Sequence, residues 1–183
     1  MYNATPEDRT NFEEAGTGIT SDTVGFTVFM RFLAPPQPSS SGIPGNPSTA
    51  SIQRGRQYFS SVHCDLCHTP SLQTAGSNFT SGLDHQSANL YSDLIVHNMG
   101  NGLSDNVVQG AAGAKEFRTA PLWGVGQRIF FLRDGRATPA NGGLLTAIQQ
   151  HASSGSEANA VIYAFNHIDE SKKQDLLNFL RSL

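Results

Sequence analysis

The sequence predicts an all-α domain that has long irregular loops and is preceded by an N-terminal arm. Apolar residues recur at helical spacing in several segments. No two candidate strands are joined by a hairpin turn. A run rich in proline, serine and glycine separates the first segment from the rest. We therefore expect an arm over residues 1–34, a linker over residues 35–48 and a main domain over residues 49–183.

The arm carries the first apolar stripe. Between positions 24 and 33 its members are Val24, Val28, Phe29, Phe32 and Leu33. Their spacing is typical of a helix, although Phe26 and Met30 widen the stripe and do not exclude a strand.

The main domain has four segments with helical character. They are a segment from Ser51, then residues 88–98, 144–152 and 170–183. In the first of them Gly55 shares a face with Ile52 and Phe59, where the missing side chain permits a close crossing by another helix. Residues 69–86 and 101–143 contain many turn-forming residues, so we expect them to be mostly irregular.

Composition limits the classes of function. The chain has 183 residues, with 12 basic and 15 acidic side chains and a net charge of −3, so it lacks the basic footprint of a nucleic-acid-binding protein. The longest apolar run, residues 24–34, is interrupted by Arg31 and is shorter than the roughly 18 residues of a membrane span. Charged residues make up only 15% and hydrophobic residues 38%, so we expect something besides side chains to fill the centre.

Residues 64–68 carry the chemistry. They read Cys64-Asp65-Leu66-Cys67-His68, which is the C-x-x-C-H signature of c-type haem attachment. The two thiols add to the vinyl groups of one haem, and His68 binds its iron. We therefore expect one covalent haem c, attached through Cys64 and Cys67.

Other interpretations of the cysteine pair are less favoured. A thioredoxin-like pair needs a βαβ context, which the sequence does not suggest. A structural zinc site needs four ligands, and His63 with His68 and two cysteines would crowd them into a short segment. Two inert core cysteines followed by a histidine by chance remain the third alternative.

Several residues could provide a second axial ligand to the iron. The candidates are His63, His85, His97, Met99, His151 and His167. His151 follows Ile148 by three positions and Leu144 by seven, so it lies on the apolar face of its expected helix. We expect His151 to be the second ligand, with Met99, four positions after Ile95, in reserve.

Together these strings resemble a known family. They are residues 54–56 (RGR), 64–70, 91–94 (YSDL), 117–124 (FRTAPLWG), 131–137 (FLRDGRA), 179–183 (FLRSL) and much of residues 5–36. The chain resembles the C-terminal part of bacterial di-haem oxidoreductases of the peroxidase type, formerly called thiol oxidoreductase-like. These proteins belong to the superfamily of di-haem cytochrome c peroxidases and MauG. The resemblance covers essentially the whole chain.

The resemblance implies a cytochrome c-like haem domain without its N-terminal haem partner, because this chain has one C-x-x-C-H. In that superfamily the C-terminal haem mostly stores or relays an electron, and its sixth ligand follows the Asp-Gly turn, which maps to His151. Arg133 stands where the family usually has His, which weakens a role of this domain in activating peroxide. Arg133, Arg118 and Arg136 are candidates to pair with a haem propionate. Phe59 and Trp123 complete the expected haem-binding set, although plain core packing is the commoner role for Trp123.

The expected function is electron transfer by a mono-haem domain, with a peroxidase-like enzyme acting on peroxide or a partner protein as the alternative and a gas-sensing module as a third. The expected partner is a redox protein or a second haem domain, and the apolar arm could support self-association. The chain shows no signal peptide. Haem attachment of this kind takes place outside the cytoplasm, so we expect a periplasmic or otherwise exported protein.

Overall fold

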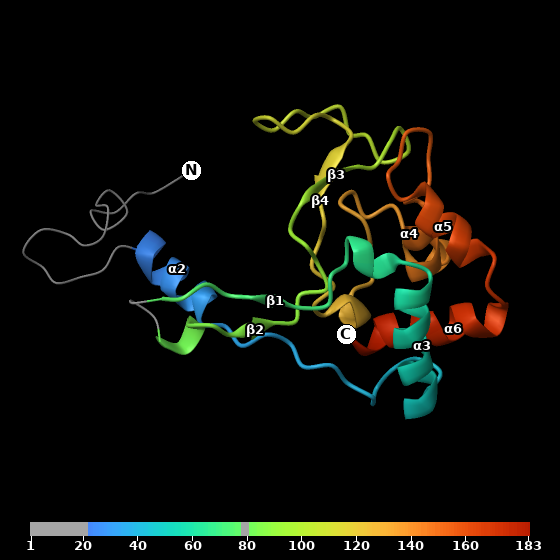
Figure 1. The fold of residues 1–183 in the computed structure, drawn as a ribbon, viewed down its shortest axis with the longest axis horizontal. Coiled ribbons are helices and arrows are strands. Elements are labelled where there is room, and N and C mark those ends of the chain that lie inside the picture. Colours follow the sequence, from blue (N-terminus) through green and yellow to red (C-terminus); the bar gives the residue numbers. More distant parts are fainter. Residues whose placement is uncertain (1–21, 78–80) are drawn as a thin grey trace, which may run out of the picture. The chain divides into compact units, whose positions relative to one another are not determined.

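The computed structural model describes residues 22–77 and 81–183. The chain divides into two compact units, residues 1–35 and 36–183, which are considered separately. The first holds α2 (Asp22–Arg31). The second holds the helices α3 (Thr49–Ser61), α4 (Leu144–Gln149), α5 (Asn159–Asn166) and α6 (Glu170–Ser182), and the strands β1 (Leu72–Gln73), β2 (Ser87–Ala88), β3 (Val96–Asn98) and β4 (Glu116–Arg118) (Figure 1). None of the described helices is both long enough and apolar enough to span a membrane.

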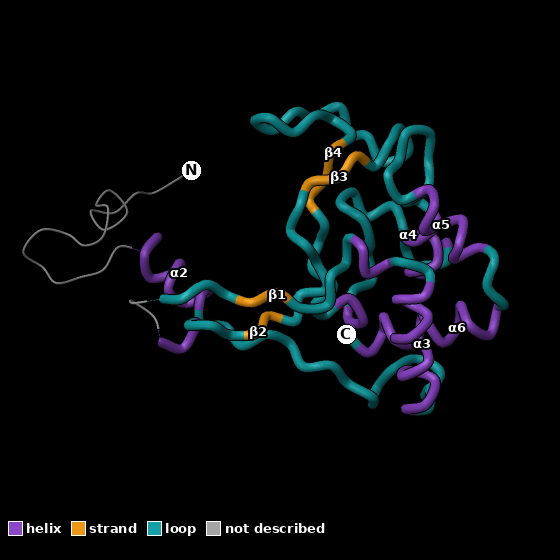
Figure 2. Tube along the Cα trace, viewed as in Figure 1, coloured by secondary structure: helices purple, strands orange, loops and turns teal. Residues whose placement is uncertain are grey.

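The prediction of an all-α fold is wrong. The chain is 38% helical and also forms two small antiparallel sheets, so its class is mixed α/β. One sheet pairs β1 with β2, and the other pairs β3 with β4. Long loops connect these elements and make up much of residues 36–183 (Figure 2). Such short strands leave little periodicity in a sequence, which is why the pattern did not reveal them.

Residues 88–98 form turns and then β3, where a helix was expected. Tyr91 and Leu94 have φ values of 51° and 61°, which a right-handed helix cannot accommodate. The carboxylate of Asp93 accepts a hydrogen bond from the main-chain N–H of Ile95 at 2.9 Å, an arrangement that competes with helical bonding. Local side-chain bonding therefore overrides the apolar spacing of this segment.

The other expected helices are present, in α2, α3, α4 and α6. The helix expected over residues 144–152 ends earlier, at Gln149. Helix α5 was missed, because it is short and has no side-chain cap to mark its start. The part of the arm that precedes residue 22 lies outside the described residues.

Helices α3 and α6 cross at close range around Gly55 (Figure 1). A Cβ at Gly55 would overlap the main-chain carbonyl of Asp175 and lie 2.7 Å from Cβ of Phe179. The crossing buries a cluster of apolar side chains that includes Phe59, Val62, Phe165, Leu176, Phe179 and Leu180. The expected close crossing at Gly55 is therefore confirmed, and it anchors the end of α3 that leads into the C-x-x-C-H segment.

A buried carboxylate joins the same two helices. Asp175 in α6 accepts hydrogen bonds from Ser51 Oγ at 2.5 Å and from Arg54 Nε at 2.7 Å. Asn178 Nδ2 donates to Ser51 Oγ at 3.0 Å. Burial alone would raise the pKa of Asp175, but the bonds from Arg54 and Ser51 outweigh it and lower the pKa below its ordinary value of 3.8.

Replacement of Gly55 by Ala is expected to lower the free energy of unfolding by about 2–3 kcal/mol, because the methyl group meets main-chain atoms that cannot move aside. Urea unfolding measures the loss. Gly82→Ala is the control, since a Cβ there meets open space. Equal urea midpoints for the two variants would contradict the close crossing.

Replacement of Asp175 by Asn is expected to make the free energy of unfolding fall less steeply as the pH is lowered into the acid range. The folded-state pKa is depressed, so this carboxylate stabilises the fold above pH 3.8, and the contribution is lost as the pH falls through the folded-state value. Urea unfolding between pH 7 and pH 3 should show a steeper acid loss for the native chain than for the variant. Glu170→Gln, an exposed carboxylate on the same helix, should keep the native slope, and identical slopes for all three proteins would refute the assignment.

Candidate functional site

The C-x-x-C-H segment begins directly after α3. His63 adopts a left-handed conformation with φ of 68°, which turns the chain into a short 3₁₀ turn over Cys64–Leu66. The main-chain N–H of His68 donates to the carbonyl of Cys64 at 3.0 Å and closes the loop between them. Both cysteines are free thiols and are partly buried. One tight turn therefore holds Cys64, Cys67 and His68 together.

Both thiols have a raised pKa, unlike the reactive thiols of a dithiol oxidoreductase. Burial raises the pKa of Cys64 to about 12, and the Asp65 carboxylate adds to the effect. Burial also raises the pKa of Cys67, and the negative charges of Asp93 and Glu157 raise it further. Reactive C-x-x-C pairs depend on a lowered thiol pKa. The environment thus argues against the thioredoxin-like alternative.

His68 is held by a main-chain carbonyl. Its Nδ1 lies 3.0 Å from the carbonyl oxygen of Tyr91. A carbonyl only accepts, so Nδ1 carries the proton and donates it, and Nε2 keeps its lone pair. Burial lowers the pKa of His68 to about 4, which keeps the ring neutral. The rings of Phe59 and Tyr91 pack edge to face, and Phe59 also lies 6.4 Å from the ring centre of His68.

His151 is held in the same manner, by a main-chain carbonyl. It follows α4, and its Nδ1 donates to the carbonyl of Ala147 at 2.7 Å. Burial lowers the pKa of His151, so its Nε2 also carries a lone pair. Ser156 Oγ donates to the carbonyl of His151 at 2.6 Å and ties the following loop to this residue.

The two histidine rings lie next to each other. Their centres are 6.4 Å apart and their planes are inclined at 59°. Among the described residues, no hydrogen bond reaches Nε2 of either ring. Metal–imidazole bonds of about 2.0 Å place two ring centres roughly 6 Å apart across one metal ion. The spacing of His68 and His151, beside two free thiols, is therefore compatible with a metal ion held between the two rings.

The other predicted site residues are distributed as follows. Phe59 packs against His68, whereas Trp123 donates its indole N–H to the carbonyl of Asn89. The main-chain N–H of Met99 donates to the carbonyl of Lys115, and Ser153 Oγ donates to the carbonyl of Met99. Arg118 is exposed on β4. Arg133 pairs with Asp105 and lies over the ring of Phe117, and Arg136 pairs with Asp134. In the described part of the chain, none of these contacts joins Met99, Trp123 or the arginines to His68 or His151. Their roles at a haem stay predictions.

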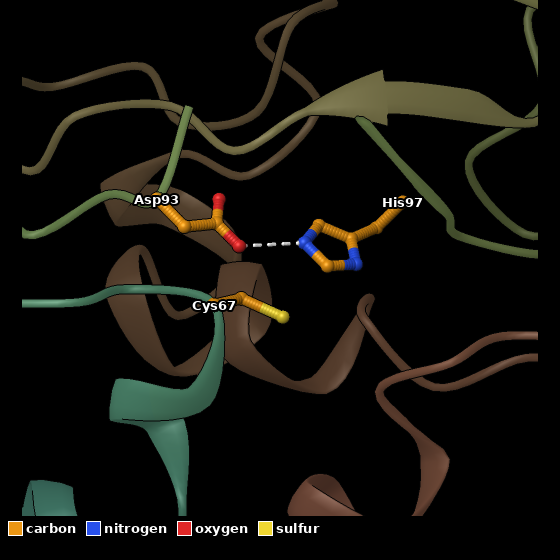
Figure 3. Close-up of side chains that lie close together, drawn as sticks. All are labelled: Cys67, Asp93 and His97. Atoms are coloured by element: carbon orange, nitrogen blue, oxygen red, sulfur yellow. Dashed lines mark hydrogen bonds and ion pairs between the residues drawn. The ribbon is translucent and has the colours of Figure 1, made fainter. Parts of the chain in front are cut away.

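A second polar cluster lies beside Cys67. His97 Nε2 is 2.8 Å from Asp93 Oδ2, and His97 Nδ1 is 2.8 Å from Glu157 Oε2. Figure 3 shows Cys67 Sγ directed toward the Asp93–His97 pair, and these three groups lie within 4.8 Å of one another. This cluster was not predicted from the sequence. Asp93 and His97 are four residues apart and could have suggested a pair, but nothing local indicates Glu157, sixty residues further along.

Comparison with known proteins identifies a family for this chain. Residues 10–183 match the family model described as "Di-haem oxidoreductase, putative peroxidase". Neither the curated proteins nor the solved structures gave a significant match. The matched range contains the C-x-x-C-H turn, both histidines and the crossing of α3 with α6. The chain therefore belongs to the di-haem oxidoreductase family.

Proposed function

We propose that this chain is a mono-haem c-type cytochrome domain that transfers electrons, and that it forms the C-terminal electron-relay part of a two-haem oxidoreductase. The observation that carries the proposal is the pair of neutral histidines, His68 and His151, whose ring centres are 6.4 Å apart. The single C-x-x-C-H supports one covalent haem in this chain. Membership of a di-haem family supports a second haem on another part of the complete enzyme.

The residues have distinct roles in this proposal. Cys64 and Cys67 hold the haem covalently, and His68 and His151 offer Nε2 to its iron. When bound, the haem supplies a one-electron couple between ferric and ferrous iron. The carbonyls of Tyr91 and Ala147 keep each ring oriented, which limits reorganisation when the charge of the site changes. If His68 and His151 both bind the iron, the site would leave no position for a substrate.

The second candidate is a peroxidase-like enzyme, which the family description favours. That chemistry needs an open position on the iron, so His151 would have to move away. It also benefits from a group that accepts a proton from peroxide, and a guanidinium such as that of Arg133 offers only hydrogen-bond donors. Its pairing with Asp105 and Phe117 further favours a structural role. Electron relay is therefore the stronger proposal.

The proposed chemistry also bears on location and partners. Thioether attachment of haem occurs outside the cytoplasm, so we propose an exported, periplasmic protein whose partner is a second haem domain or a redox protein. Helix α2 exposes apolar side chains, among them Phe26, Phe29 and Met30. Such a surface supports self-association through the arm or docking to another domain.

The haem content is the first test. The chain, exported by a cell that matures c-type cytochromes, should gain the mass of one haem that survives denaturation. The double variant Cys64→Ser, Cys67→Ser should lose it, because a hydroxyl does not add to the vinyl groups. Intact-protein mass spectrometry measures both. A native chain with no covalent haem, or a double variant that keeps it, would refute the assignment.

The second test concerns His151. The native ferric protein should be low-spin and should bind neither carbon monoxide when reduced nor peroxide. Replacement of His151 by Ala should open one axial position and give a high-spin ferric spectrum that responds to carbon monoxide after reduction. His167→Ala, an exposed histidine at the end of α5, is the matched control and should match the native spectrum. A His151→Ala spectrum that remains low-spin would move the ligand elsewhere, with Met99 the next candidate.

A further inference from the structure

His97 bridges two carboxylates that come from distant parts of the chain. Asp93 and Glu157 each place an oxygen 2.8 Å from one of its ring nitrogens. An ionised carboxylate only accepts hydrogen bonds, so each ring nitrogen must donate. A neutral imidazole has one N–H, whereas the imidazolium has two. The geometry therefore requires a doubly protonated His97 between two ionised carboxylates.

The Asp93 end of this bridge leads to His68. The main-chain N–H of Asp93 donates to the carbonyl of Cys67 at 2.8 Å. Tyr91, two residues before Asp93, supplies the carbonyl that holds His68 Nδ1. The loop over residues 91–93 thus touches the C-x-x-C-H turn at two places.

The Glu157 end leads to His151. Glu157 Oε1 accepts a hydrogen bond from the main-chain N–H of Asn98 at 2.9 Å. The main-chain N–H of Glu157 donates to the carbonyl of Asn98, also at 2.9 Å. The preceding residue, Ser156, donates its hydroxyl to the carbonyl of His151. The loop over residues 153–157 is therefore attached both to β3 and to the second histidine.

We propose that His97, as an imidazolium shared by Asp93 and Glu157, is a positioning residue that ties the loop holding His68 to the loop holding His151 and so maintains their separation. The inference rests on the proposed haem site. Removal of either bond would break this connection between the two loops and weaken the seat of His151. The hydrogen bonds of Glu157 to Asn98 and of Ser153 to Met99 would still hold the loop at residues 153–157 in place.

The electrostatics agree with this geometry. The hydrogen bond to Asp93 raises the pKa of His97 above its ordinary value of 6.5, the bond to Glu157 adds to the effect, and partial burial opposes it. The groups that face the ring are Asp93 from the loop before β3, Glu157 from the loop before α5, and the uncharged Cys67 side chain. Both carboxylates have a lowered pKa, and the bond to His97 contributes to each.

The test measures how easily an outside ligand displaces His151 in the haem-loaded protein. The rate of cyanide binding to the ferric protein reports this opening. His97→Ala should raise the rate by about tenfold or more, as expected for loss of a charge-assisted hydrogen bond. Glu157→Gln, which keeps an acceptor oxygen but loses the charge, should give a smaller increase. It also provides the readout if His97→Ala does not fold.

Two matched variants serve as controls. His167→Ala removes an exposed histidine, and Glu170→Gln removes an exposed carboxylate. Both should keep the native cyanide rate. A His97 variant that is less heat-stable but binds cyanide at the native rate would show that His97 only supports the fold, and would overturn the proposal.

Nitrogen-15 NMR of His97 in the reduced protein at neutral pH gives an independent readout. Two protonated ring nitrogens are expected, and a single protonated nitrogen would overturn the bridge. Failure of the parent proposal looks different: the native protein itself would lack haem or show a high-spin spectrum. A low-spin native protein whose His97 and Glu157 variants match the controls would reject the bridge alone.

Discussion

The site depends on two hydrogen bonds from imidazole N–H groups to main-chain carbonyls. Tyr91 holds His68 and Ala147 holds His151, and each bond leaves Nε2 with a free lone pair on one of two neighbouring rings. Burial keeps both rings neutral, so the pair is poised to bind a metal without first releasing protons. Neither carbonyl could be replaced by a flexible side chain without loss of orientation, because the ring can rotate unless its second nitrogen is fixed.

The remainder of residues 36–183 supports this arrangement. The crossing of α3 with α6 at Gly55 packs Phe59 and Phe179 together, and Phe59 in turn lies against His68. The left-handed turn at His63 then directs the chain from α3 into the C-x-x-C-H segment. The low charge content and modest apolar content of the chain fit a domain whose centre is completed by a large apolar cofactor. The helices set the position of the C-x-x-C-H turn, and the loops bring His151 close to it.

The central residues of the candidate site could be identified from the sequence, whereas the fold could be predicted only in part. The C-x-x-C-H string is local, and the apolar spacing around His151 is helical, so both could be recognised from short windows. Residues 88–98 were predicted to form a helix from their apolar spacing. That spacing does not reveal that Tyr91 and Leu94 adopt left-handed conformations. The contact of His97 with Glu157 joins residues sixty positions apart and depends on tertiary folding, which no local pattern reports. The contacts of Arg133, a candidate partner of a haem propionate, with Asp105 and Phe117 are again long-range and could not be predicted from local patterns.

The central claim is that His68 and His151 are the two axial ligands of one haem iron. Near-infrared magnetic circular dichroism of the ferric protein tests this most directly, because the position of its charge-transfer band identifies the pair of axial ligands. The account predicts the band of a low-spin iron with two histidine ligands. A band typical of histidine–methionine ligation, or of high-spin iron with an open position, would contradict it.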